Sequence, residues 1–176
     1  MPEAFETMLA GGHPNSLGRT AEVVDLVLAT PERFGELFAC YGGHDAAVRL
    51  RTSNAMKRIE SEQRDLLVPY VDRLIGEVGA LDQASAQWTL AQLFGRLAAD
   101  LSARQRLAAV ELMKHNLEHH SDWIVLNATM ETLSEWAKDD PALRLWLLPQ
   151  LERLCRDQRK SVAGRAAKKL KVLATS

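Results

Sequence analysis

Three histidines near the end of one helical stretch are the residues best spaced to bind a metal ion. His115 and His119 are four residues apart, which places both rings on one helix face, and Glu111 lies one turn earlier. That spacing can hold zinc, but a zinc protease needs His-Glu-x-x-His, and no third ligand accompanies the pair. Imidazoles near a helix C-terminus also interact favourably with the helix dipole, so a solvated helix end is the favoured interpretation. We predict no metal site and no cofactor.

Catalysis by a nucleophile finds no support in the residues. Ser, His and Asp are all present, but no nucleophile elbow or other local signature groups them. The carboxylates are scattered as helix-surface charges. Residues 11–18 are rich in glycine, yet they lack Gly-Lys-Ser/Thr and follow no strand pattern, which excludes a phosphate-binding loop of that type. We predict no catalytic residues, so an enzyme is the less favoured class.

Composition favours a soluble helical protein. Apolar residues make up 47% of the 176 residues and charged residues 26%, while runs of strand-favouring residues are missing. No stretch has about 18 uninterrupted apolar residues, so we expect no membrane span. Cys40 and Cys155 lie far apart without CxxC spacing, which predicts reduced thiols in a cytoplasmic protein. A disulfide and a pair of metal ligands remain the minority alternatives.

The elements that would position functional groups follow an internal repeat. Met56, Phe94, Leu133 and Leu170 occupy equivalent places and are separated by 38, 39 and 37 residues. A period of about 38 is typical of stacked supersecondary units. Apolar periodicity, caps and breakers predict helices over 4–10, 21–29 (capped by Thr20), 30–41, 45–60, 62–78, 83–99, 102–119, 121–138, 141–157 and 159–174. Pro69 should kink the helix over 62–78.

Two features of these units resemble HEAT repeats. One is an internal proline in the first helix of a pair, in Leu-Val-Pro69-Tyr and Leu-Leu-Pro149-Gln, and the other is Asp-x-x-Val-Arg opening the second helix at Asp45. The resemblance covers residues 31–174. It implies an all-α, right-handed α-solenoid of about four antiparallel helix pairs, with one or two extra helices before them. The second helices would line the concave side.

We therefore expect an N-terminal arm, 1–19, and a single repeat domain, 20–176. Its repeats are predicted at 31–60, 62–99, 102–138 and 141–174. A pair of amphipathic helices cannot bury its apolar face alone, so neighbouring pairs must supply the core.

The concave face carries the predicted contact residues. Aligning the repeats places one row of residues beside the core stripe of each second helix: Arg51, Asn54 and Arg58; Thr89, Gln92 and Arg96; Ala128, Glu131 and Glu135; Arg165, Lys168 and Val172. We predict polar contacts to a partner at Arg51, Arg58, Arg96, Arg165 and Lys168. Of the tryptophans, Trp136 falls on the core register, whereas Trp88 and Trp123 are open to being exposed contact residues.

Charge divides the chain unevenly. Residues 1–152 carry a net −8, and residues 153–176 carry +7, with Asp157 as their single acid. The basic end is a solubilising cap, a dock for an acidic protein or a second copy of the chain, or a phosphate contact. The leading hypothesis is a non-catalytic protein-interaction module, with a homodimer left open. The alternative is a nucleic-acid-binding protein similar to HEAT-like DNA glycosylases, although Glu131 and Glu135 would interrupt a basic groove. HEAT-like lyases acting on bilins are a third possibility.

Overall fold

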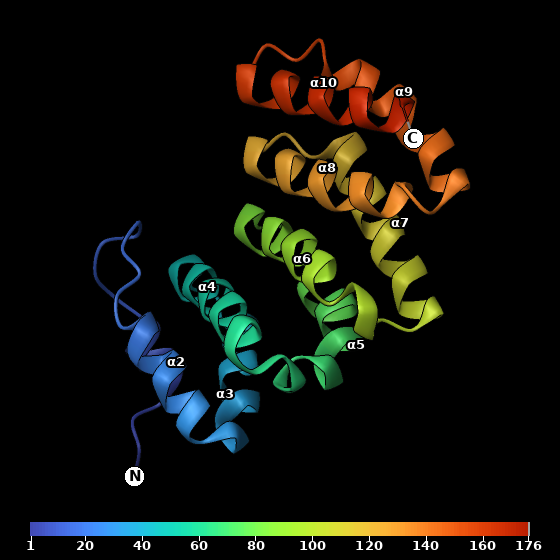
Figure 1. Cartoon of the computed structure of the whole chain (residues 1–176). Coiled ribbons are helices and arrows are strands. Elements are labelled where there is room, and N and C mark those ends of the chain that lie inside the picture. The colour runs from blue at the N-terminus through green and yellow to red at the C-terminus, as the bar shows by residue number, and fades with distance from the viewer. Residues whose placement is uncertain (176) are drawn as a thin grey trace. The chain divides into compact units, whose positions relative to one another are not determined.

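The computed structural model describes residues 1–175, and these residues form helices joined by short linkers (Figure 1). No strand occurs within that range, so the all-α prediction is confirmed. The chain forms two compact units, Met1–Thr89 and Leu90–Ser176, with the boundary inside helix α6 (Ala84–Arg96). The solenoid and the single domain stay predictions.

In the first unit, four helices pack around one apolar core. They are α1 (Phe5–Leu9), α2 (Thr20–Ala29), α3 (Phe34–Ala39) and α4 (Ala46–Gln63). Helix α4 lies against α1 and α2. The largest apolar side chains that are fully buried between these helices are Phe5, Leu9, Leu37, Phe38, Met56 and Ile59. These buried residues belong to the apolar pattern from which the helices of this unit were predicted.

Two predictions in this unit need correction. Thr20 does not cap α2, because the helix begins at Thr20 itself and the buried hydroxyl donates to the Leu17 carbonyl. The helix predicted over 30–41 is split, with 3₁₀ turns at Pro31–Arg33 and Cys40–Gly42 on either side of α3. Proline at the start and glycine at the end favour such short turns over a continuous helix.

The helix predicted over 62–78 is not formed: residues 62–63 are the end of α4, and residues 64–78 are a chain of short turns. This segment contains 3₁₀ turns η3 (Arg64–Leu66) and η4 (Val68–Tyr70), one turn of α-helix, α5 (Val71–Arg73), and a π-helical turn, η5 (Leu74–Val78). Pro69 lacks an amide donor and its ring crowds the preceding turn, which disfavours a regular helix here. The effect of the proline is therefore stronger than the kink predicted from the sequence.

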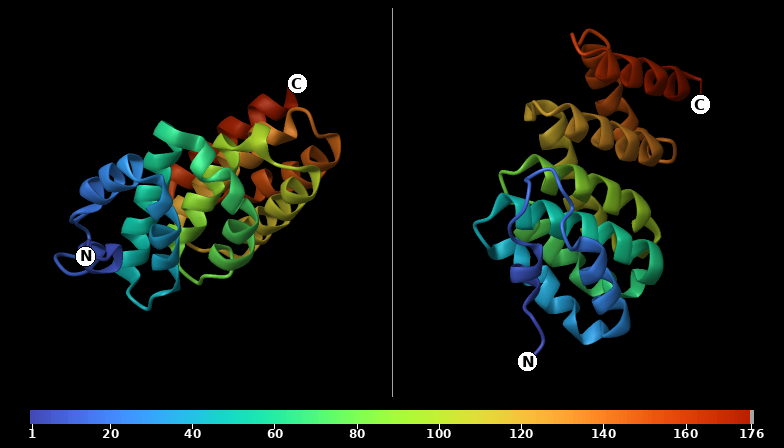
Figure 2. Two further views of the ribbon diagram at one scale, coloured as in Figure 1. Left: turned by 90° about the horizontal axis from the view of Figure 1, so that it is seen from below. Right: turned by 90° about the vertical axis from the view of Figure 1, so that its left-hand side faces the viewer.

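The second unit contains α7 (Ala103–His119), α8 (Trp123–Ala137), α9 (Pro141–Leu154) and α10 (Lys160–Ala174), together with the end of α6. Helices α8 and α10 lie side by side, α9 packs against both, and α7 packs against α8 (Figures 1 and 2). Pro149 lies inside α9 without ending it.

Of the four residues at equivalent places in the repeats, Met56, Phe94 and Leu133 are fully buried, while Leu170 is only partly buried.

The start of α7 has a capping box formed by Ser102 and Gln105. The Gln105 amide donates to the Ser102 hydroxyl at 3.1 Å, and the Ser102 amide donates to the Gln105 side-chain oxygen at 2.9 Å. Two amides at the helix end, which have no partner within the helix, are satisfied in this way.

Replacing Ser102 by alanine should lower the free energy of unfolding by about 1 kcal/mol, because one amide at the helix start loses its acceptor. Urea denaturation followed by circular dichroism measures the loss. Ser121→Ala is the matched control, since Ser121 is also exposed just before a helix while Asp122 caps that helix. Equal losses in the two variants would contradict the capping role.

Candidate partner-binding groove

A groove opens on the second unit where the end of α6, the length of α8 and one residue of α10 face each other. Its volume is about 480 Å³. The two longer walls come very close together near Gly95, because a Cβ atom there would lie 2.9 Å from the Thr132 hydroxyl. That hydroxyl donates to the Ala91 carbonyl at 2.7 Å and ties the two helices together. We call this feature the α8 groove.

One ridge of α8 supplies the functional side chains. Trp123, Asn127, Glu131 and Glu135 follow each other at intervals of four residues, so they stand in one row along the helix. All four line the α8 groove. The row thus offers, in order, an aromatic ring, an amide and two carboxylates.

The two tryptophans in the groove have different environments. Trp136 is only 5% exposed, and the guanidinium of Arg106 lies 4.2 Å from the centroid of its ring. The prediction that Trp136 packs in the core is confirmed. Trp123 is the first residue of α8 and is 49% exposed, so its indole remains open to solvent.

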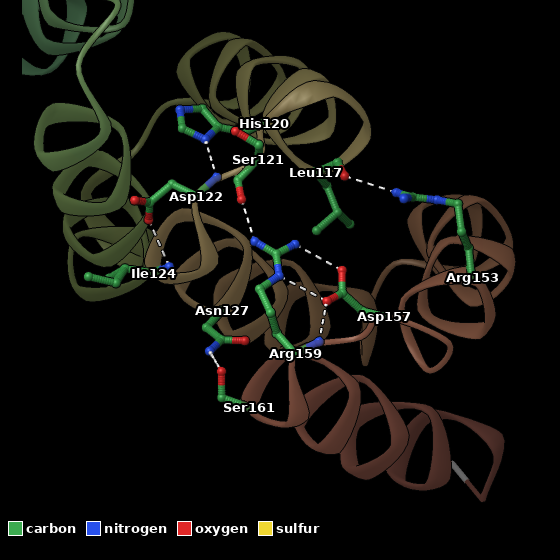
Figure 3. Close-up of polar contacts among 10 residues, drawn as sticks. All are labelled: Leu117, His120, Ser121, Asp122, Ile124, Asn127, Arg153, Asp157, Arg159 and Ser161. Atoms are coloured by element: carbon green, nitrogen blue, oxygen red, sulfur yellow. Dashed lines mark hydrogen bonds and ion pairs between the residues drawn. The ribbon is translucent and has the colours of Figure 1, made fainter.

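Asn127 is a buried polar residue with an unused acceptor. It is 7% exposed, and its Oδ1 atom has no hydrogen-bond donor. Its Nδ2 atom makes one long hydrogen bond, 3.5 Å, to the hydroxyl of Ser161 on α10 (Figure 3). An acceptor buried without a donor costs free energy, so a side chain of this kind in a groove wall indicates a place where a ligand can donate a hydrogen bond.

Glu131 is held by two cations of α10. Its carboxylate oxygens lie 2.6 Å from Arg165 Nη1 and 2.6 Å from Lys169 Nζ. Partial burial acts to raise the pKa of Glu131, but the hydrogen bonds and charges of Lys169 and Arg165 outweigh it and leave the pKa below its usual value. Glu135 forms an ion pair with Lys138. Both acids of the ridge therefore already have cationic partners.

A second depression adjoins the α8 groove on α10. It has a volume of about 420 Å³ and shares Glu131 and Arg165 with the groove. Its other side chains are mostly cationic, and we call it the basic pocket: Lys160, Ser161, Gly164, Lys168 and Lys169. The α8 groove and the basic pocket therefore form one continuous surface.

The loop before α10 is fixed by arginine contacts, as Figure 3 shows. Arg159 binds Asp157 with two side-chain hydrogen bonds of 2.9 Å and donates to the Ser121 carbonyl at the start of α8. Hydrogen bonding to Arg159 lowers the pKa of Asp157 to about 2. Arg153 donates to the Leu117 carbonyl at 3.0 Å. The Arg159 contact therefore ties the start of α10 to the start of α8, and the Arg153 contact ties α9 to α7.

The predicted contact residues fall into three groups. Arg96 and Arg165 line the α8 groove and Lys168 lines the basic pocket, so the structure brings these three onto one surface. Arg58 is exposed on α4, in the first unit, beside a shallow depression that also includes Asp25. Arg51 is buried.

The burial of Arg51 revises the role we assign to it. Its guanidinium donates to four carbonyl oxygens of the segment between α1 and α2, those of Leu9, Gly11, His13 and Ser16, at 2.5 to 3.0 Å. Because those contacts lie 35 to 42 residues away, helix spacing alone placed Arg51 on an open face. Arg51 fastens the glycine-rich arm and is covered by it.

Asn127 and Lys160 were missed by the sequence analysis. A signal for Asn127 was available, since continuing the row of Glu135 and Glu131 backwards by four residues reaches Asn127 and then Trp123. No sequence signal identifies Lys160, because its place beside Lys168 depends on the start of α10.

The metal and thiol hypotheses find no further support. The rings of His115 and His119 are 4.7 Å apart at their centroids, and both residues are exposed. Within residues 1–175, no group of three or more His, Cys, Asp or Glu is arranged to hold a metal ion. Cys40 and Cys155 are free thiols, and burial, with Glu6 and Glu36 nearby, raises the pKa of Cys40 to about 11. A thiol with that pKa is protonated near neutral pH and is a poor nucleophile.

Among the described residues, no helix is both long enough and apolar enough to cross a membrane. Comparison of the chain with protein-family models, with curated proteins and with solved structures gives no match.

Proposed function

We propose that the chain is a non-catalytic protein-interaction module of the HEAT-like solenoid type, and that a segment of the partner protein lies in the α8 groove. The observation that carries the proposal is Trp123, a large aromatic residue that is 49% exposed and lines a groove of about 480 Å³. Exposed tryptophans in concave sites are frequent binding hot spots.

Three properties of the groove support this proposal. Trp123, Ile124 and Ala128 supply apolar surface, and the charged residues that also line the groove are Arg96, Glu131, Glu135 and Arg165. Asn127 retains an unused acceptor for a main-chain or side-chain N–H of the partner. The helices that build the walls are rigidly tied by the Thr132 hydrogen bond and by the contacts of Arg159. A prepared site of this kind loses little conformational entropy on binding.

The solenoid part of the proposal depends on the repeat. The second helices of the four predicted pairs occur as α4, α6, α8 and α10, each at its predicted place in the chain. The period of about 38 residues and the internal prolines resemble HEAT repeats. Within the second unit, consecutive second helices, α8 and α10, lie side by side, as stacked repeats require.

Nucleic acid is the second candidate partner, and the basic pocket is the observation that favours it. Lys160 and Lys168 are exposed and available to phosphates. Glu131 and Glu135 interrupt the row of cations that a continuous phosphate backbone needs along the adjoining groove, so a protein partner fits the whole surface better. Binding to duplex DNA that weakens steeply with salt and disappears in Lys168→Ala/Lys169→Ala would favour the nucleic-acid candidate.

A library of random dodecapeptides displayed on phage tests the protein-binding proposal. We expect selection on the immobilised chain to enrich peptides whose binding falls at least about tenfold in Trp123→Ala, because a central aromatic contact is removed. Leu145→Ala is the matched control, since Leu145 is 75% exposed on α9, outside the groove. Peptides that bind both variants equally, or no enrichment at all, would contradict the proposal.

A further inference from the structure

We propose that the partner segment is acidic and carries one apolar anchor residue, with the anchor beside Trp123 and its carboxylates at the basic pocket. This inference rests on the proposed function and specifies the chemistry of the occupant. It is carried by the charge of the continuous surface that joins the α8 groove to α10.

Cations outnumber acids on this surface. Its acids are Glu131 and Glu135, and its cations are Arg96, Arg165, Lys160, Lys168 and Lys169. Complementary charge steers association and selects the partner. Since the cations are in excess, the complementary segment is negatively charged.

The acids of the groove are poor sites for a basic segment. Glu131 already contacts Arg165 and Lys169, and Glu135 contacts Lys138. A lysine or arginine of a partner would have to displace these cations and approach the remaining positive charges of α10. By contrast, Lys160 and Lys168 form no ion pair within residues 1–175, so an incoming carboxylate meets available donors.

Glu131 occupies the position of a ligand carboxylate. It bridges Arg165 and Lys169 at the border of the two depressions, and its side chain is 52% exposed. A carboxylate of the partner can take over these two cations by displacing Glu131. Replacing Glu131 with glutamine removes the competing charge and should strengthen the binding of an acidic segment.

The apolar anchor belongs at the start of α8. Trp123 and Ile124 lie at the start of α8, and Ser161 of α10 lies beside Asn127 (Figure 3). The basic pocket begins at Lys160 and Ser161. A segment that runs from the indole to the first lysine of α10 therefore passes the free acceptor of Asn127.

The test uses three phage libraries of dodecapeptides in which random positions alternate with fixed Glu, fixed Lys or fixed Gln. Each library is selected on the full chain at low ionic strength and counter-selected on Trp123→Ala. We expect Trp123-dependent peptides from the Glu library, with a hydrophobic residue recurring at one random position. Their affinity should fall at least about tenfold in Lys160→Glu/Lys168→Glu and rise severalfold in Glu131→Gln, because charges in direct contact are changed.

Lys171→Glu is the matched control. Lys171 is exposed on α10, like Lys160 and Lys168, but it lines neither the α8 groove nor the basic pocket. This variant therefore changes the net charge without changing the proposed binding surface. Binding that falls equally in Lys171→Glu and in the double variant would show a nonspecific charge effect and overturn the inference.

The remaining outcomes separate the inference from the proposed function. Trp123-dependent peptides from the Lys or Gln library alone would overturn the acidic specificity and leave the interaction module standing. No Trp123-dependent peptide from any library would overturn both. Light scattering that shows a dimer at low salt, dissociated by Lys160→Glu/Lys168→Glu, would identify a second copy as the occupant and overturn the inference of a different protein.

Discussion

Replacing Arg51 by methionine should lower the free energy of unfolding by about 3 kcal/mol or more, although methionine fills much of the same volume. Arg51 is fully buried, and four carbonyl oxygens of the preceding arm accept hydrogen bonds from its guanidinium. Hydrogen bonds to a charged group contribute about 1.5–3 kcal/mol each, but the carbonyls of a surface arm can regain water once the arm opens. The net loss is therefore smaller than the sum of four bonds.

The arm should be released at the same time. Its backbone turns through left-handed conformations at Gly11, Gly12 and Gly18, and Gly18 packs so closely that a Cβ atom would lie 3.3 Å from Arg51 Cζ. The hydrogen bonds from the Arg51 guanidinium therefore hold the backbone of this arm in place. Limited proteolysis should thus cut residues 10–19 faster in Arg51→Met, while urea denaturation records the loss of stability.

Two further variants make this test specific. Arg51→Lys keeps the charge but offers donors from a single nitrogen, which cannot span four separate carbonyls, so only part of the stability should return. Arg58→Met, also on α4 but exposed, should change stability by less than about 0.5 kcal/mol. Equal stability of Arg51→Met and Arg58→Met, with an unchanged rate of cleavage in the arm, would contradict this role for Arg51.

Replacing Trp136 by alanine should cost about 3–5 kcal/mol of stability, the range for removing a large buried aromatic side chain. Trp136 is 5% exposed, on the last turn of α8, and Arg106 of α7 lies over its ring. Its removal leaves a cavity and also ends the attraction between the guanidinium and the indole. Both losses fall on the packing of α7 against α8.

Trp123→Ala is the matched control for this variant, since it makes the same chemical change on the same helix at a residue that is 49% exposed. We expect it to lower stability by less than about 1 kcal/mol. Calorimetry of both variants therefore separates a packing tryptophan from a binding one. A loss of stability in Trp123→Ala as large as that in Trp136→Ala would show that Trp123 is part of the core and would remove the main argument for the groove.

Local signals in the sequence predicted most of the helices. Asp45, Ser102, Asp122 and Asp140 cap the helices that follow them, as their residue types and positions indicate. The spacing of apolar residues within each helix then indicates which face is buried. The same pattern recurs about every 38 residues, which indicates that the units repeat. The break at 62–78 was underestimated, since the effect of Pro69 depends on how the surrounding turns repack.

The groove was predictable only in part. Aligning the repeats placed Gln92, Arg96, Glu131, Glu135 and Arg165 on one face, and all five line the α8 groove. Its depth was not predictable, because that depends on the close approach of α6 and α8 at Gly95. The burial of Arg51 was missed for a similar reason, since the carbonyls that bind it belong to a distant segment without regular structure.

The location of a bound peptide tests the central claim most directly. The chain is labelled with ¹⁵N, and its amide and indole signals are recorded by NMR during titration with an acidic dodecapeptide selected from the Glu library. We predict that the indole signal of Trp123 and the amide signals of residues 123–135 and 160–168 shift together and saturate at one equivalent. Saturable shifts confined to other residues, with the Trp123 indole unchanged, would contradict the claim that the α8 groove is the binding site.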